Sequence, residues 1–156
     1  MKGISDMKFF LLFLFILMVG CSSTPQKKSI YSPSYLNKDK LKQLNFNHKN
    51  LILVPIHGVW YYVRRDGKMM QPIITEKGEV ERFHEGLART RIHGKIGFFD
   101  KNLDLVLPPL YDFAFPFHEG MADVCIGCRE VQEDGYRLLE GGKWKRINRQ
   151  GLLIEE

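Results

Sequence analysis

Residues 94–124 have the sequence GKIGFFDKNLDLVLPPLYDFAFPFHEGMADV, and parts of this stretch recur on either side of it. Ile56-His57-Gly58 matches Ile92-His93-Gly94, 36 residues later, and the FHEGLA of residues 83–88 matches the FHEGMA of residues 117–122, 34 residues later. A third, truncated copy spans residues 142–151, GKWKRINRQG. Self-similarity at a nearly constant period indicates an internal structural repeat.

Each copy contains two apolar segments joined by a short polar turn. Segments 51–56 and 59–63 flank His57-Gly58, and segments 87–92 and 95–100 flank His93-Gly94. Branched and aromatic residues around a two-residue turn with glycine are typical of β-hairpins. Further turns at 65–67, 101–103 and 149–151 predict a third short strand in each copy, such as 105–107. A lone hairpin is not stable, so the copies must pack together.

These features predict an all-β domain over residues 51–156, built as an array of two and a half hairpin repeats. Alternation along the second strand of each hairpin puts Trp60 with Tyr62, Ile96 with Phe98, and Trp144 with Arg146 on one face. The predicted repeat core is therefore Trp60, Tyr62, Ile96, Phe98 and Trp144. Glycine tolerates the positive φ that tight turns require, and the predicted turn glycines are Gly58, Gly67, Gly86, Gly94, Gly120 and Gly151.

The copies resemble the WG-repeat family, also written KWG. Its units run approximately Lys-Trp-Gly-aromatic-Ile-Asp, a turn glycine, Pro-x-Tyr-Asp and Phe-x-Glu-Gly-Leu-Ala. The second copy matches best, with GFFD at 97–100, PLYD at 109–112 and FHEGMA at 117–122. The resemblance implies a small all-β array in an envelope or secreted protein, with no enzymatic activity attached to the motif.

The N-terminus has the layout of a secretory signal. Lys8 precedes an apolar run over residues 9–19, which is about half the length that a membrane span needs. Residues 17–21, LMVGC, resemble the lipobox of bacterial lipoproteins, whose cysteine carries fatty acyl chains such as palmitate. We expect a signal peptide at 1–20, starting at Met1 or Met7, and a lipidated Cys21. Ser22 after this cysteine indicates the outer membrane, facing the periplasm of a bacterial envelope.

Charge is distributed unevenly along the chain. The formal net charge is +5, yet residues 51–156 hold 15 basic and 16 acidic residues. The excess lies in residues 21–50, whose Ser, Pro and Lys predict a flexible basic tether, with one or two helical turns within 35–44. Nucleic-acid binding needs a basic face on the folded module, so no nucleic-acid partner is expected.

Cys125 and Cys128 form the sharpest local feature, in what we interpret as an insertion between two strands. A structural disulfide is favoured in an oxidising envelope. The alternatives are a redox-active pair and a metal site, but neither a βαβ setting nor a second cysteine pair accompanies them. His57, His84, His93 and His118 fall at repeated positions, which indicates a geometric role, and Glu85 and Glu119 are expected to stabilise turns.

The sequence contains no constellation of catalytic residues, and we expect no enzyme, cofactor or metal. Exposed aromatic residues such as Tyr61 or those in 113–117 could form a ligand face, although packing of the repeat core is the favoured use. The expected function is a non-catalytic binding or scaffolding module, anchored to the membrane, with a protein or envelope polymer as partner. The alternative is a thiol-redox or metal-handling protein that acts through Cys125 and Cys128.

Overall fold

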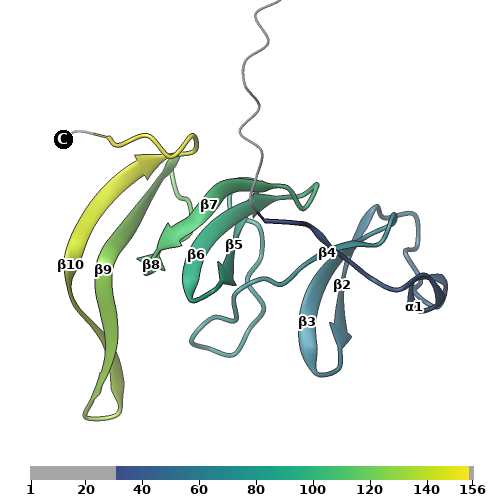
Figure 1. Cartoon of the computed structure of the whole chain (residues 1–156), viewed down its shortest axis with the longest axis horizontal. Coiled ribbons are helices and arrows are strands. Elements are labelled where there is room, and N and C mark those ends of the chain that lie inside the picture. The colour runs from purple at the N-terminus through teal and green to yellow at the C-terminus, as the bar shows by residue number, and fades with distance from the viewer. Residues whose placement is uncertain (1–30, 155–156) are drawn as a thin grey trace, which may run out of the picture.

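The structure, a computed structural model, describes residues 31–154 and is built almost entirely of antiparallel strands. Three sheets lie in a row (Figure 1): a first sheet of order β1-β4-β3-β2, a middle sheet β5-β6-β7, and a third sheet β10-β9-β8. The predicted all-β fold is confirmed. The elements are β1 Ser34–Tyr35, α1 Lys38–Lys42, β2 Leu51–Ile56, β3 Val59–Arg64, β4 Lys68–Met70, β5 Leu87–Ile92, β6 Lys95–Asp100, β7 Leu105–Tyr111, β8 Phe113–Ala114, β9 Met121–Glu133 and β10 Tyr136–Asn148.

Two-residue turns set the register of the hairpins. At His93-Gly94, between β5 and β6, φ is 49° and 80°, so both residues are left-handed. Two left-handed residues are the requirement of a type I′ turn, whose twist matches that of the flanking strands. The same pattern recurs at His57-Gly58, Glu85-Gly86, Glu119-Gly120 and Asp134-Gly135. The six predicted turn glycines all have positive φ.

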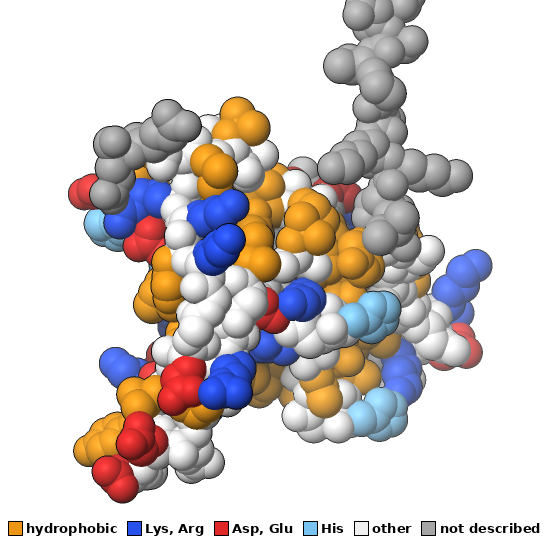
Figure 2. Space-filling view, turned by 60° about the vertical axis from the view of Figure 1, so that its left-hand side comes forward, with side chains coloured by type: hydrophobic (Ala, Val, Ile, Leu, Met, Phe, Trp, Pro, Cys, Tyr) orange, Lys and Arg blue, Asp and Glu red, His pale blue; other side chains and the backbone are white. Residues whose placement is uncertain are grey.

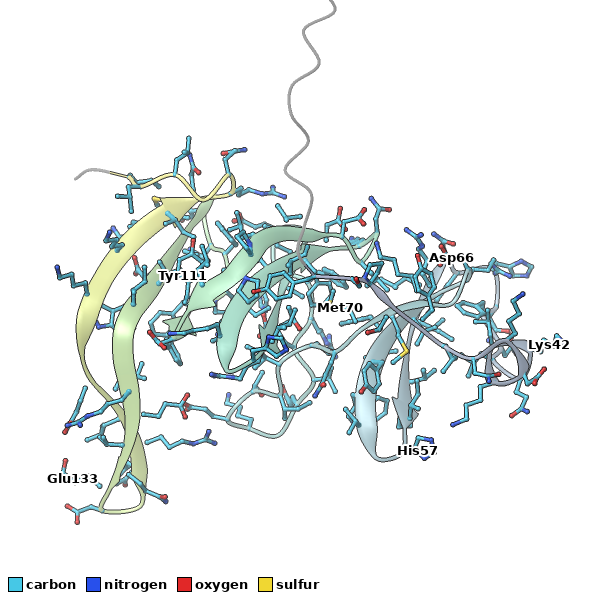
Figure 3. All side chains as sticks on the ribbon, viewed as in Figure 1. Lys42, His57, Asp66, Met70, Tyr111 and Glu133 are labelled. Atoms are coloured by element: carbon cyan, nitrogen blue, oxygen red, sulfur yellow. A yellow bond between two sulfur atoms is a disulfide. The ribbon has the colours of Figure 1, made fainter. Side chains whose placement is uncertain are left out.

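The middle sheet is buried on both of its faces. Phe98 and Phe99 are adjacent on β6, so their side chains point to opposite faces, and both are at most 1% exposed. Phe98 belongs to the core shared with the third sheet, and Phe99 to the core shared with the first. Tyr111 and Met70, labelled in Figure 3, lie at these two boundaries. Neighbouring copies therefore share their cores, as the instability of a lone hairpin requires.

A buried ion pair joins the copies as well. The Glu81 carboxylate accepts a hydrogen bond from Arg89 Nε at 2.8 Å, and the guanidinium also donates to the Ala114 carbonyl oxygen in the third sheet. The side chains of Glu81 and Arg89 are 1% and 10% exposed. Because each charge is paired and hydrogen-bonded, its burial is tolerated, whereas removal of one partner would leave an uncompensated charge.

Two residues of the predicted core are wrongly assigned. Ile96 and Phe98 are buried and Tyr62 packs against the Phe99 cluster, but Trp60 is 39% exposed and Trp144 is 45% exposed. Trp144 occupies the position of Ile96 in the repeat. Ile96 is covered because the third sheet packs against its face, and among the described residues no further sheet covers Trp144.

The predicted tether is structured over the residues of it that the structure describes. β1 pairs with β4, Leu36 N donates to Gly67 O at 2.8 Å, and α1 falls within the stretch expected to form helical turns. Phe46 is buried, with the Arg65 guanidinium 5.2 Å from the centre of its ring. The fold therefore begins well before residue 51, because apolar residues within the lysine-rich stretch pack onto the first sheet.

The predicted insertion is a lengthened hairpin rather than a loop. β9 and β10 are 13 residues each and turn at Asp134-Gly135, so both cysteines lie within β9. Gly142, which aligns with the turn glycine Gly94 in the truncated third copy, lies inside β10. The distal half of this hairpin projects beyond the three sheets (Figure 1). Added residues extended both strands in register, since their pairing persists to Glu133 and Tyr136.

Candidate functional site: an aromatic face over a disulfide

Three residues form a row across the third sheet. Phe113 on β8 pairs with Cys125 on β9, and Cys125 pairs with Trp144 on β10. Directly opposed residues present their side chains on the same face of a sheet. The opposite face, with Ala114, Val124 and Ile147, packs into the core. The row therefore lies on the outward face of the third sheet.

Aromatic rings cover this outward face. The rings of Phe115 and Trp144 are stacked, with centroids 5.9 Å apart and an interplanar angle of 27°. Phe113 meets both edge-on, at 5.1 Å from Phe115 and 6.0 Å from Trp144. Phe115 and Trp144 remain 49% and 45% exposed. Large rings half open to solvent are typical of interaction surfaces, and we call these three residues the aromatic face.

The disulfide between Cys125 and Cys128 lies beneath this face. It joins two residues of one strand, with a Cα–Cα distance of 5.9 Å. Cys125 is fully buried and Cys128 is 8% exposed. Gly142 on β10 makes room for it, because a Cβ there would lie 2.7 Å from each sulfur. Reactive cysteines need an accessible thiolate, so this burial favours a structural disulfide. We expect it to stabilise the strand segment that carries Cys125 between Phe113 and Trp144.

Asp112 connects the disulfide segment to the middle sheet. Its carboxylate accepts a hydrogen bond from Gly127 N at 2.6 Å and pairs with the Lys95 ammonium on β6. The hydrogen bond from Lys95, followed by that from Gly127, lowers the pKa of Asp112. The carboxylate is therefore charged at neutral pH and holds the bend between the two cysteines.

An open groove borders the aromatic face on the side of β10. Its volume is about 690 Å³. Asp123 and Arg146 within it form an ion pair, with Nε 2.8 Å from Oδ1. The lining residues are Phe115, Asp123, Leu139, Trp144, Lys145, Arg146, Leu153 and Ile154.

The other residues singled out in the sequence lie elsewhere. His57 and His93 are turn residues at the ends of the first two hairpins. Glu85 Oε2 accepts a hydrogen bond from Gly120 N at 3.0 Å, so it stabilises the equivalent turn of the next copy. Phe117, in contrast to Phe113 and Phe115, is buried in the core.

Within residues 31–154, no group of three metal-ligating side chains comes together. No helix in that range is long and apolar enough to cross a membrane. The predicted signal peptide at 1–20 and the lipidation site Cys21 lie outside the described residues.

Comparison with known proteins gives one match, to a repeat family. Residues 96–127 match the family model for the WG containing repeat. The match begins on β6 and ends within the disulfide segment, so it includes Phe113, Phe115 and Cys125. Over these residues it confirms the resemblance to the WG repeat that was predicted from the sequence. No curated protein matches the chain, and neither does any solved structure.

The sequence did not indicate that Trp144 belongs to this face. Its repeat position predicted burial, as it did for Ile96, but the third sheet covers Ile96 and no described sheet covers Trp144. No local signal in the sequence identifies it, because the exposure of this position depends on which sheets pack against its face.

Proposed function

We propose that this chain is a non-catalytic binding module that is held at a bacterial membrane by lipid on Cys21. The aromatic face is the observation that carries the binding part of this proposal. In the middle sheet the equivalent face packs on the next sheet, whereas Phe115 and Trp144 are half exposed. An apolar surface of this kind is stabilised when a partner removes it from water.

The anchoring part rests on sequence. The short apolar run before Cys21 and the LMVGC segment support export and acylation, and the WG-repeat match is consistent with an envelope protein. The function would therefore be exercised at a membrane surface, toward an envelope protein or polymer. The buried disulfide supports the face mechanically, which argues against the thiol-redox alternative.

Site-specific photo-cross-linking in intact cells tests the binding part. A photoreactive phenylalanine analogue at position 115 or 144 of the full-length chain should capture one dominant partner. The same analogue at Trp60, an exposed tryptophan on the first sheet, is the matched control and should not. Equal capture from all three positions, or none, would contradict the proposal.

Two further variants test the lipid anchor and the thiol-redox alternative. Cys21→Ser should release the protein from the membrane fraction, and retention there without an acyl chain would refute the lipid anchor. Replacing Cys125 and Cys128 together with Ala should leave cross-linking at position 115 largely intact. Complete loss of function with a folded domain would favour the thiol alternative.

A further inference from the structure

The outer edge of β10 is incompletely paired. In the middle sheet, β7 covers β6 from Ile96 to Phe99. In the third sheet, residues 152–154 cover only the end of β10, where Asn148 N donates to Leu152 O and Ile154 N donates to Arg146 O, both at 2.9 Å. No other described residue pairs with that side of β10. The outer edge of β10 is therefore paired near Arg146 to Asn148 and open in the preceding residues.

The main-chain groups of Trp144 point toward this edge. N–H and C=O groups alternate in direction along an antiparallel strand. Because those of Arg146 and Asn148 bond to residues 152–154, those of Trp144, two residues earlier, face the same side. An exposed edge with free donors and acceptors is a template for an added strand.

In the middle sheet, β7 occupies the edge of β6 that corresponds to the open edge of β10. A comparison of the two edges explains why no such strand covers β10. β7 passes so close to Gly97 that a Cβ there would lie 2.7 Å from Leu107 O. Lys145 occupies the position of Gly97 in the repeat and is one of the residues that line the groove. The close crossing made by β7 is therefore not available over β10, and the groove stays open.

The chemistry of this edge is basic and apolar. β10 carries four basic residues and one acidic residue. Lys143 and Lys145 are exposed and have no ion-pair partner among the described residues. Leu139, Trp144 and Leu153 supply apolar surface in the adjoining groove. Figure 2, with this side turned forward, shows basic side chains beside hydrophobic ones over the upper part of the third sheet, and acidic side chains among those at the tip of the hairpin.

We propose that the edge of β10 binds an extended peptide segment in which apolar and acidic residues alternate. This inference rests on the proposed function, because it names the chemistry of the partner. The segment adds as a strand beside Trp144, with its acidic residues against Lys143 and Lys145 and its apolar residues in the groove. A second copy of the chain fits poorly, because pairing β10 with itself about Trp144 opposes Lys143 to Lys145, and directly opposed like charges are destabilising.

Fluorescence anisotropy with two labelled eight-residue peptides tests the charge requirement. One peptide alternates Val with Glu, and its matched control alternates Val with Lys. The acidic peptide should bind about tenfold more tightly to the full chain, since each opposed charge pair adds a modest increment. Lys143→Glu with Lys145→Glu should reverse the preference. Equal binding of both peptides, or no reversal in a folded variant, would overturn the proposal.

A pair of variants at position 144 tests strand addition itself. Trp144→Ala removes the ring and keeps the N–H, whereas Trp144→Pro removes both, and proline is tolerated at a free edge. Strand addition predicts that Trp144→Pro binds the acidic peptide about fivefold more weakly than Trp144→Ala. Wild-type binding should also slow hydrogen exchange of the Trp144 amide. Equal affinities, or an unprotected amide at saturation, would refute strand addition.

The outcomes also separate this inference from the proposed function. A cellular partner still cross-linked at position 115 in the Trp144→Pro variant would overturn strand addition and leave the binding module standing. A dimer that forms without peptide, seen by sedimentation and lost in the Lys-to-Glu variant, would replace the peptide by a second copy. Absence of any cross-linked partner would refute the proposed function, independently of the peptide measurements.

Discussion

The middle and third sheets are copies of one repeat with different surroundings. Ile96 and Phe98 on β6 are buried, whereas Trp144 and Arg146 at the equivalent positions of β10 lie on an outward face with half-exposed rings. Both strands alternate in the same way and both follow a hairpin turn. Ile96 and Trp144 therefore differ in whether a described sheet packs on their face, whereas Trp60 stays exposed on the first sheet even though the middle sheet packs beside it.

A second difference concerns the strand edges. Gly97 lets β7 cross closely over β6, and Lys145 in its place leaves β10 open. The residues that depart from the repeat pattern thus coincide with the surface that departs from the repeat packing. Both departures therefore fall on the outward face and the edge of the third sheet.

Truncating one side chain on each of the two equivalent faces tests most directly whether the faces differ in burial. Phe98→Ala should lower the free energy of unfolding by about 3–5 kcal/mol, because it leaves a cavity in a close-packed core. Trp144→Ala should cost about 1 kcal/mol, mainly the ring contact with Phe115. Urea unfolding followed by circular dichroism measures both changes.

Trp60→Ala is the matched control, since Trp60 is also an exposed tryptophan on a second hairpin strand. It should resemble Trp144→Ala. Similar losses for Phe98→Ala and Trp144→Ala would mean that the outward face is covered in solution, and the distinction between the two sheets would not hold.

The sequence predicted most of the fold because its signals are local. His-Gly turns and flanking β-formers determined the hairpins β2–β3 and β5–β6 almost to the residue. Burial of Trp144 was wrongly predicted because it depends on which sheets are present, and alternation alone carries no information about that. The long β9–β10 hairpin was mistaken for an insertion because its distal residues are mostly polar, and the few apolar ones, such as Val131 and Leu139, form no sustained period-2 pattern.

The same limit applied to the candidate site. Phe113 and Phe115 were recognised as possible surface residues, but their alignment with Cys125 and Trp144 follows from pairing across three strands. Residues 21–50 were taken as a tether because their lysines outweigh a few apolar residues. Phe46 nevertheless packs on the first sheet, a long-range contact with no local signature.

The disulfide is a further difference between the two sheets, because the middle sheet contains no cysteine pair. Replacing Cys125 and Cys128 together with Ala should destabilise the domain by about 2 kcal/mol, as expected for a short closed loop. Gly142→Ala should cost about 1–3 kcal/mol in the wild type, where a Cβ meets both sulfurs at 2.7 Å. Thermal unfolding monitored at the tryptophan fluorescence reports both.

A double-mutant cycle tests whether the Cβ added at position 142 clashes with the disulfide sulfurs. Gly142→Ala should cost at least 0.5 kcal/mol less when both cysteines are Ala, roughly the coupling expected of groups in contact. The residual cost comes from Cys128 N, 2.5 Å from the added Cβ, and from the left-handed backbone of Gly142. Strict additivity would show that the sulfurs do not limit the approach of β10.

The smallest expected effect concerns the joint between the middle and third sheets. The pKa of Asp112 is lowered by hydrogen bonds from Lys95 and Gly127, and that of Asp66 is lowered from 3.8 to about 2 by the hydrogen bond from Arg64. A folded-state pKa below the unfolded value means that the unfolded chain binds more protons in between. Asp66 therefore stabilises the fold above pH about 4, and its contribution is lost as the pH falls from 4 toward 2. Asp112 acts in the same direction, because its pKa is also lowered, and its contribution is lost on acidification.

Asp112→Asn should remove part of this acid-induced loss. Because Asp66 is half exposed and Lys95 is partly exposed, solvent screens both pairs, and we expect on the order of 0.5 kcal/mol for Asp112. Urea midpoints at pH 3 and pH 6 measure the difference, with Asp134→Asn at the hairpin tip as the charge-matched control. An unchanged pH dependence in Asp112→Asn would mean that the carboxylate does not hold the two sheets together, and that the shared core alone carries the joint between them.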